Sequence, residues 1–151
     1  MEIRRITENR HNLIPLLFLA DEQMDMLERY LHRGEAFGLY DGGLIAAAIV
    51  TDEGDQVYEV QNIAVWPEHQ HKGYGKALLM YIIEHYREKA VKLVVGTGDS
   101  PITLPFYLGC GFQETHRIKD FMLSAYDHPI MENGVQLCDK VYLQIDYNVD
   151  R

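Results

Sequence analysis

The sequence predicts a mixed α/β fold, in which an antiparallel front half of a sheet is followed by one strand–helix–strand crossover. Two observations predict it. Apolar runs on both sides of Asp41-Gly42-Gly43 indicate a β-hairpin, because glycine-containing turns join neighbouring antiparallel strands. Farther along, small or apolar residues recur every three or four positions, which is the spacing of one helix face. This stripe consists of Gly75, Leu78, Leu79, Ile82, Ile83 and Tyr86.

The front half combines strands with one helical region. Residues 2–6 alternate between apolar and polar side chains, as a half-buried strand does. Residues 9–31 are predicted to be mainly helical, as two helices. The predicted hairpin strands and the strand that follows a second turn are 35–40, 44–51 and 57–65.

The back half alternates helices and strands. The periodic stripe predicts a helix over about 73–89, and a shorter helix, 102–108, ends at Gly109-Cys110-Gly111. The remaining predicted strands are 91–96, 112–123 and 135–147, the last two on either side of a polar connection. We expect the whole chain, 1–151, to form a single domain.

Composition and charge exclude several classes of function. Apolar residues make up 47% of the chain and charged residues 25%, as in globular proteins. The net charge of −9 argues against a nucleic-acid partner or an anionic membrane surface, because phosphate binding needs a basic face. The N-terminal residues lack the apolar core of a secretory signal. The two cysteines, Cys110 and Cys138, are interpreted as small buried hydrophobes in a reducing compartment, so we expect a cytoplasmic protein.

A glycine-containing loop, Gln70 to Lys76, stands between a predicted strand and the long helix. A helix start offers unpaired N–H groups to an anion, and glycines let the backbone approach it closely. The segment lacks the Gly-Lys-Ser/Thr of a P-loop, and Leu78 replaces the third glycine of a dinucleotide fingerprint. A diphosphate nest and a plain tight turn both remain open on this signal alone.

The surrounding sequence resembles a known family. The run from Asn62 to Leu79 closely resembles the signature of the GNAT superfamily of N-acetyltransferases, whose Gln/Arg-x-x-Gly-x-Gly/Ala pattern is met by Gln70, Gly73 and Gly75. A second block, Pro105-Phe106-Tyr107-Leu108-Gly109-Cys110-Gly111-Phe112, resembles the family's Phe-Tyr…Gly-Phe junction. The resemblance implies a mostly antiparallel sheet of about seven strands with helices on both faces. It also implies acetyl-CoA as co-substrate and no metal.

The resemblance also implies a cofactor site. The loop would hold the pyrophosphate, and the strand edge at Ile63 to Val65 would pair with the pantetheine arm. Ser100 stands where the family often has an asparagine, and its hydroxyl could substitute. The candidate cofactor-binding residues are Ile63, Ala64, Val65, Gln70, His71, Lys72, Gly73, Tyr74, Gly75, Lys76 and Ser100.

Two residues are candidates for catalysis. Freeing a lysine-like amine of its proton at pH 7 costs about 4.6 kcal/mol, so a base would help. Glu59 stands where some members of the family carry that base, and simple alternation puts it on the face of Gln61, Ile63 and Val65. A solvated or ion-paired glutamate is the alternative. Tyr107 matches the family tyrosine that often protonates the departing thiolate, and a packing aromatic is the alternative.

Other reactive side chains in the sequence fit no catalytic arrangement. His69 and His71 have no acidic or cysteine partner nearby, so solvent-facing histidines are favoured over metal ligands. Cys110 lacks the His/Asp constellation of a nucleophile, and direct transfer needs none.

The sequence leaves the acceptor nearly open. The connection from Tyr126 to Gly134 is either a lid over the acceptor pocket or an elongated surface loop. The candidate acceptor-side residues are Asp21, Glu22, Asp25, Tyr126, Asp127 and His128. Their carboxylates favour a cationic amine. The predicted function is acetyl transfer to a primary amine of a small molecule or peptide by direct attack in a ternary complex, with a non-catalytic acyl-CoA-binding module as the alternative and a homodimer left open.

Overall fold

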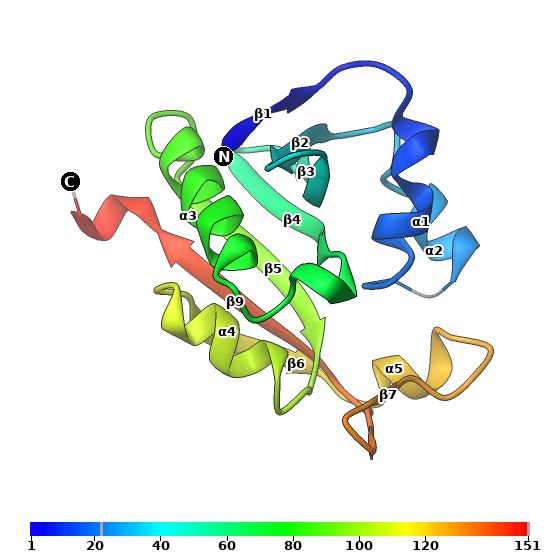
Figure 1. Cartoon of the computed structure of the whole chain (residues 1–151). Coiled ribbons are helices and arrows are strands. Elements are labelled where there is room, and N and C mark those ends of the chain that lie inside the picture. Colours follow the sequence, from blue (N-terminus) through cyan, green and yellow to red (C-terminus); the bar gives the residue numbers. More distant parts are fainter. Residues whose placement is uncertain (22, 151) are drawn as a thin grey trace.

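In the computed structural model, which describes residues 1–21 and 23–150, a seven-stranded sheet has the order β1-β2-β3-β4-β5-β9-β6 (Figure 1). All neighbours are antiparallel except β4 and β5. The strands are β1 (Glu2–Ile6), β2 (Glu35–Tyr40), β3 (Leu44–Asp52), β4 (Val57–Val65), β5 (Lys92–Gly98), β6 (Gln113–Ile118) and β9 (Lys140–Asp146). A separate two-stranded hairpin consists of β7 (Met131–Glu132) and β8 (Val135–Gln136).

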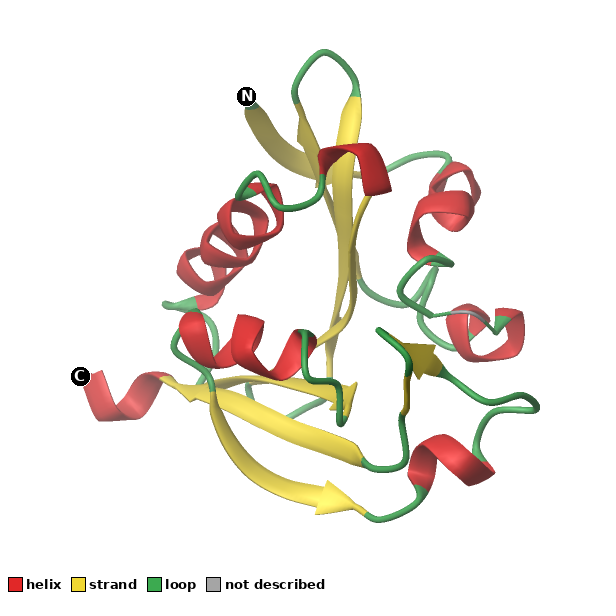
Figure 2. Ribbon diagram, turned by 60° about the horizontal axis from the view of Figure 1, so that its bottom comes forward, coloured by secondary structure: helices red, strands yellow, loops and turns green. Residues whose placement is uncertain are grey.

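Helices cover both faces of this sheet. Figures 1 and 2 show α3 and α4 on one face and α1 and α2 on the other. The α-helices are α1 (Ile14–Leu17), α2 (Met24–Glu28), α3 (Tyr74–Tyr86), α4 (Thr103–Gly109) and α5 (Phe121–Ser124). The 3₁₀ helices are η1 (Arg10–Leu13), η2 (Pro67–His69) and η3 (Tyr147–Asp150). The predicted mixed fold, with its mostly antiparallel sheet and two helical layers, is confirmed.

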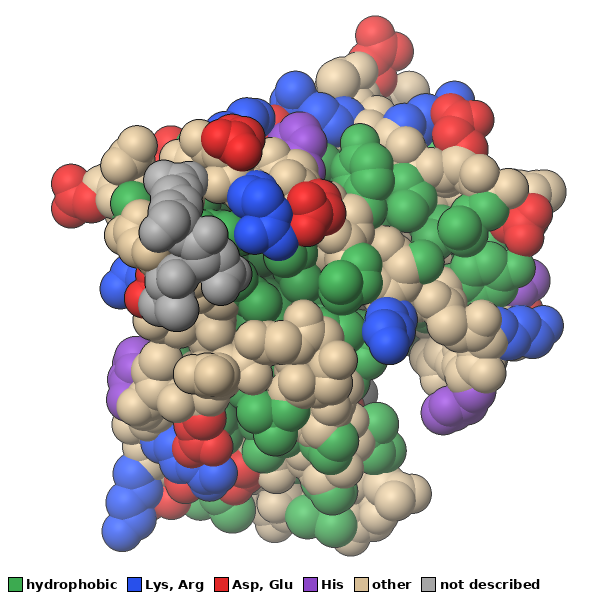
Figure 3. Space-filling view, turned by 90° about the vertical axis from the view of Figure 1, so that its left-hand side faces the viewer, with side chains coloured by type: hydrophobic (Ala, Val, Ile, Leu, Met, Phe, Trp, Pro, Cys, Tyr) green, Lys and Arg blue, Asp and Glu red, His purple; other side chains and the backbone are tan. Residues whose placement is uncertain are grey.

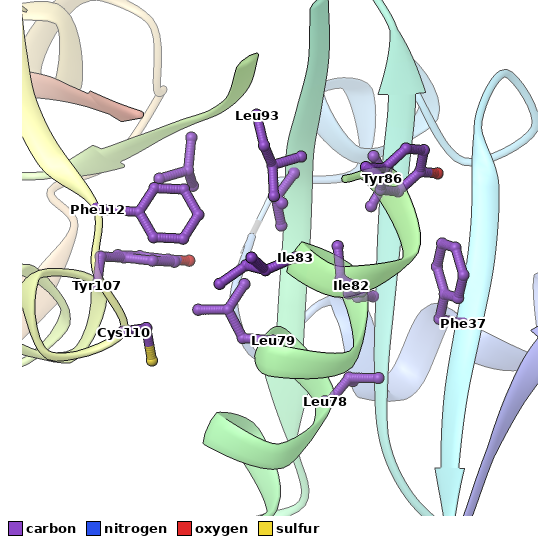
Figure 4. Close-up of a cluster of buried hydrophobic side chains, with 14 of the residues drawn as sticks. Phe37, Leu78, Leu79, Ile82, Ile83, Tyr86, Leu93, Tyr107, Cys110 and Phe112 are labelled. Carbon is purple, nitrogen blue, oxygen red and sulfur yellow. The ribbon is translucent and has the colours of Figure 1, made fainter. Parts of the chain in front are cut away.

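The core consists of one apolar layer on each face. On the α3 face, the predicted helical stripe is buried against Phe37 of β2 and Leu93 of β5 (Figure 4). On the α1 face, Leu17 and Leu27 pack against Ile49 of β3. Because β3 is covered on both sides, its sequence reads as a continuous apolar run rather than an alternating one.

The outer surface mixes both signs of charge. On the face drawn in Figure 3, Lys and Arg side chains lie among Asp and Glu side chains, with apolar side chains between them. The net charge of −9 therefore does not gather as one acidic field on this face.

The predicted boundaries of the C-terminal strands are wrong. The strand predicted over 112–123 ends at Ile118, because Asp120 adopts a left-handed conformation with φ of 60° and the chain then enters α5. The backbone N–H of Asp120 donates to Asp139 Oδ1, which fixes this turn. The strand predicted over 135–147 is divided into β8 and β9. Cys138, predicted as buried, is only half-buried.

Two helical predictions are also corrected. The long helix ends at Tyr86 rather than at Lys89. The helical region predicted over 9–31 consists of η1, α1 and α2, each a single turn or little more.

Candidate active site

The site is centred on the place where β4 and β5 separate. These parallel strands pair from Val57 with Lys92 to Val60 with Val95 and no farther. Beyond that point lies a cavity of about 450 Å³. Its wall contains side chains from both faces of the sheet, including Tyr107 of α4 and Tyr30, which follows α2. The gap therefore connects the two helical layers of the molecule.

A bulge in β4 sets which side chains face which layer. Ile49 pairs with Asn62 and Val50 with Val60, so Gln61 is an extra residue. After the bulge, Ile63 and Val65 pack in the α3 layer, whereas Asn62 bonds to α1. The extra residue shifts the period-two alternation by one position.

Glu59 therefore lies on the face opposite to the predicted one. It pairs with Thr51, whose hydroxyl accepts a hydrogen bond from Gln61 Nε2 at 3.0 Å, and it lines the cavity toward Arg33 and Glu53. Burial raises the pKa of the Glu59 carboxyl above its usual value, and the positive charge of Lys140 partly opposes this. The predicted common face with Ile63 and Val65 is wrong, because alternation cannot foresee a bulge.

The loop before α3 presents a row of free backbone donors. Among the described residues, no partner accepts a hydrogen bond from the N–H groups of residues 71 to 76. Gly73 begins the helix with φ of 89°, a left-handed conformation that glycine adopts without strain, and a Cβ there would point into open space. Gln70 Nε2 donates to the Val65 carbonyl at 3.0 Å and ties the loop to β4. This row fits an anion such as a diphosphate.

Electrostatics around this loop favour an anion as well. The thirteen residues of α3 direct the positive end of the helix dipole at it. Lys72 and Lys76 are exposed at its two ends. The Tyr74 hydroxyl donates to Asp41 Oδ2 at 2.7 Å, so the loop is also tied to the β2–β3 turn. Gly75 lies where a Cβ would approach Val65 Cγ2 at 3.4 Å, so a larger side chain would crowd β4.

Tyr107 joins the cavity to the α3 layer. Its side chain is 7% exposed and packs edge-to-face against Phe106 and Phe112 (Figure 4). No hydrogen bond among the described residues engages its hydroxyl, and the residue lines the cavity. Burial, followed by the nearby Cys110 and Glu132, raises the pKa of the phenol. The phenol is therefore protonated at neutral pH and available as a donor.

On the predicted acceptor side, Asp21 links two segments of the chain by hydrogen bonds. Its carboxylate accepts hydrogen bonds from the hydroxyls of Tyr30 at 2.9 Å and Tyr126 at 3.1 Å. Gln23 Oε1 accepts from the backbone N–H of Asp127 at 2.9 Å, a second link between the same two segments. Burial raises the pKa of the Asp21 carboxyl, and the two tyrosine hydroxyls partly offset this.

The other predicted acceptor residues are less involved. Asp25 is exposed on α2 and does not line the cavity. His128 contacts Asp127, with Nδ1 2.6 Å from Oδ1, outside the cavity wall. Glu22 lies outside the described residues. The connection that follows Tyr126 contributes Ile130, Met131 and Glu132 to the wall, as the lid interpretation expects.

Comparison with known proteins decides the family. The sequence model of the acetyltransferase (GNAT) domain family matches residues 32–114. This segment contains Glu59, Tyr107 and the backbone N–H groups of residues 71–76. A curated *Bacillus subtilis* protein, the uncharacterized N-acetyltransferase YvbK, is 37% identical over 142 residues and covers 92% of both chains. The chain belongs to the GNAT acetyltransferases.

Solved structures of GNAT acetyltransferases share the whole fold. A *Bacillus subtilis* acetyltransferase in complex with CoA is 37% identical and superimposes with a TM-score of 0.89, covering 96% of this chain and 97% of its own. An *Elizabethkingia anophelis* GNAT acetyltransferase with acetyl-CoA bound is 31% identical, with a TM-score of 0.86 over 96% and 97% of the two chains. The resemblance drawn from the sequence is therefore confirmed.

Ser100 has a structural task in this GNAT chain. It is fully buried, and its Oγ accepts hydrogen bonds from the N–H groups of Ile102 at 3.0 Å and Thr103 at 3.2 Å. These are orphan donors at the start of α4, which carries Tyr107. Through this contact Ser100 helps to position the tyrosine.

Several cavity residues escaped sequence reasoning. Tyr30 and Met122 lie in parts of the chain without any motif. Asn62 could have been singled out from the sequence, because it is a polar residue directly before the apolar strand end Ile63 to Val65. Glu132 belongs to the connection that the sequence offered as a lid, but nothing singled it out there, and for Lys140 the sequence carried no signal. Only the tertiary fold brings β7 and β9 to the gap.

Two features are absent from the described part of the chain. No group of three or more His, Cys, Asp or Glu side chains is arranged to hold a metal ion. Within residues 1–21 and 23–150, none of the helices has the length and apolar character needed to cross a membrane.

The free donors predict a charge-specific effect of replacing Gly73. Aspartate and asparagine both tolerate the left-handed conformation, so Gly73→Asp and Gly73→Asn differ mainly in charge. We expect the aspartate variant to bind acetyl-CoA about tenfold to a hundredfold more weakly than the asparagine variant, because a carboxylate repels a diphosphate through partly screened solvent. Isothermal titration calorimetry checks this. If the two variants bind acetyl-CoA equally well, the diphosphate does not lie at the Gly73 loop.

Proposed function

We propose that this chain transfers the acetyl group of acetyl-CoA to a primary amine of a small molecule or peptide, by direct attack in a ternary complex. The observation that carries the proposal is the single cavity at the β4–β5 gap, which has Tyr107 in one wall and Glu59 and Asp21 in another. One space thus offers an acid for a leaving group and carboxylates for an amine.

The donor half is supported by the row of free N–H groups and by β4. Residues 71–76 would hold the diphosphate. The edge of β4 from Ile63 to Val65, which does not pair with β5 and on which Gln70 Nε2 donates to the Val65 carbonyl, would pair with the pantetheine arm. The Ala64 side chain packs in the α1 layer, so only the backbone of this residue would contact the pantetheine arm. An N–H on this edge would polarise the thioester carbonyl where negative charge develops. Bound CoA and acetyl-CoA in the two relatives support this assignment.

Tyr107 would protonate the departing thiolate. Its raised pKa keeps the phenol protonated, its hydroxyl has no hydrogen-bond partner among the described residues, and the residue lines the cavity. A thiol has a pKa of about 8.5, so the developing thiolate is a weaker base than a phenolate. Proton transfer to sulfur is therefore uphill but helps to prevent the reverse attack.

Glu59 would accept the proton of the attacking amine. Because burial raises its pKa, the carboxylate is a better base than an exposed glutamate. It lies on the α1 face, whereas the edge that would hold the thioester extends along the α3 layer. A relay through water accommodates this separation.

A non-catalytic acyl-CoA-binding module is the second candidate. It would use the same donors but needs neither carboxylates nor a free phenol at the gap, so the shared cavity favours the enzyme. A thiol-release assay across polyamines, aminoglycosides, amino acids and peptides separates the two. Acetyl-CoA binding without release for any amine would support the module. Under the enzyme proposal we expect a cytoplasmic protein, as a monomer or a homodimer.

The acid role of Tyr107 is tested by Tyr107→Phe, which removes only the hydroxyl. We expect kcat to fall by about a hundredfold or more, as for the loss of a general acid, with the Kd for acetyl-CoA unchanged within about twofold. Tyr81→Phe, at an exposed position on α3, makes the same change away from the cavity and should leave both values unchanged. If kcat is unchanged in Tyr107→Phe, Tyr107 is not the general acid and serves only in packing.

The base role of Glu59 is tested through the pH profile of kcat/KM. A base must be deprotonated, so activity should rise with pH through the raised pKa of Glu59. Glu59→Gln should lower the plateau by about a hundredfold or more and remove this limb. Lys140→Met removes a positive charge that lowers the Glu59 pKa, so in this variant the rising limb of the profile should shift to higher pH. A profile with the same limb in Glu59→Gln would assign the titration to another group.

A further inference from the structure

Two buried acceptor atoms in the described part of the chain have no hydrogen-bond partner. They are Asn62 Oδ1 and Glu132 Oε2, and both residues line the cavity at the β4–β5 gap. Buried polar atoms in folded proteins are almost always paired, and an unpaired one is costly, most of all in a charged group. Both orphans are acceptors, so what they lack is a donor.

The side-chain amide of Asn62 is held in one orientation. Its Nδ2 donates to the Leu17 carbonyl and to the Tyr30 hydroxyl oxygen, both at 2.9 Å, and the Tyr30 hydroxyl donates its own hydrogen bond to Asp21 Oδ2. Turning the amide over would set Oδ1 against the Leu17 carbonyl oxygen. At 5% exposure the residue is nearly out of reach of solvent. Oδ1 is therefore a fixed acceptor at the α1 end of the cavity.

Glu132 supplies the second acceptor from a different element. It ends β7, in the hairpin that forms part of the cavity wall. Its charge acts on Tyr107, where it adds to the effect of burial and of Cys110 on the pKa of the phenol. The hairpin and α4 thus contribute Glu132 and Tyr107 to the cavity wall, whereas Asn62 bonds to Leu17 of α1.

The cavity also contains positive groups, and Lys140 lowers the pKa values of both Glu59 and Asp21. Arg33 Nη1 lies 2.9 Å from Glu53 Oε2, in an ion pair. Lys140 Nζ lies over the rings of Phe121 at 4.7 Å and Tyr142 at 5.1 Å. Arg29, which also lines the cavity, is an exposed residue. The carboxylates of Glu59 and Asp21 add negative charge to the same cavity.

We infer that the cavity takes a linear diamine, whose two ends carry N–H donors for Glu132 Oε2 and Asn62 Oδ1. This rests on the proposed acetyl transfer and names the class of its acceptor. The two unpaired atoms belong to different strands, β4 and β7, and both residues line one cavity. A molecule with a nitrogen at each end offers a separate donor to each of them.

The first experiment compares kcat/KM for three linear primary amines of equal chain length: a monoamine, a diamine and an amine with a carboxylate at its far end. Several chain lengths are assayed. At the best length we expect the diamine to exceed the monoamine by about tenfold or more, which corresponds to one added charge-assisted hydrogen bond. The carboxylate compound should be the poorest of the three.

The variant Glu132→Gln tests whether Glu132 causes the preference for the diamine. The change keeps the shape of the side chain and removes its charge. We expect the ratio of diamine to monoamine to fall by about tenfold, with the Kd for acetyl-CoA unchanged. Glu88→Gln, at an exposed position after α3, is the matched control and should keep the ratio of the unmodified protein.

Failure of this inference is distinguishable from failure of acetyl transfer. If monoamine and diamine are acetylated equally well, or if the carboxylate compound is preferred because Lys140 binds it, the diamine assignment is wrong and acetyl transfer stands. Calorimetric titration of monoamine and diamine into the CoA-saturated protein gives the same comparison without turnover. Equal affinities there overturn the inference even for a protein that releases no thiol.

Discussion

The separation of β4 from β5 is the constraint on which the rest of the site depends. Two parallel strands that stop pairing after Val60 and Val95 leave backbone groups without partners and a space between the helical layers. Unpaired strand edges are unfavourable unless something covers them. Here the gap gives Tyr107 from one layer and Asp21 from the other access to the same cavity. A fully paired sheet would have kept the two layers apart.

The two sides of the gap have opposite electrostatic character. Residues 71–76 and the start of α3 offer backbone donors and the positive end of a helix dipole. The opposite side offers carboxylates whose pKa values are raised by burial, Glu59 and Asp21. Raised carboxyl pKa values mean that the charged forms are destabilised in the folded chain, a cost that a cationic ligand would relieve. The fold thus places groups suited to an anion and groups suited to a cation around one opening.

Sequence reasoning described the first of these sides in more detail than the second, where it named Asp21, Glu59 and Tyr126 without their arrangement. The hairpin at Asp41-Gly42-Gly43, the periodic stripe of α3 and the donors at Gly73 follow from local rules that need only a few neighbouring residues. The bulge at Gln61 reverses a face without any change in composition, so alternation misplaced Glu59. The link between Asp21 and Tyr126 joins residues 105 positions apart, and no local pattern encodes such a contact.

Amide hydrogen exchange, with and without acetyl-CoA, tests the central claim most directly, because it reads the backbone donors themselves. If the unpaired N–H groups and the open edge of β4 hold the co-substrate, exchange slows in peptides that cover residues 61–65 and 71–76. The β2–β3 hairpin, at 35–52, serves as an internal reference and should not change. Protection confined to other segments, or unchanged exchange at both sites while acetyl-CoA is bound, would contradict the assignment.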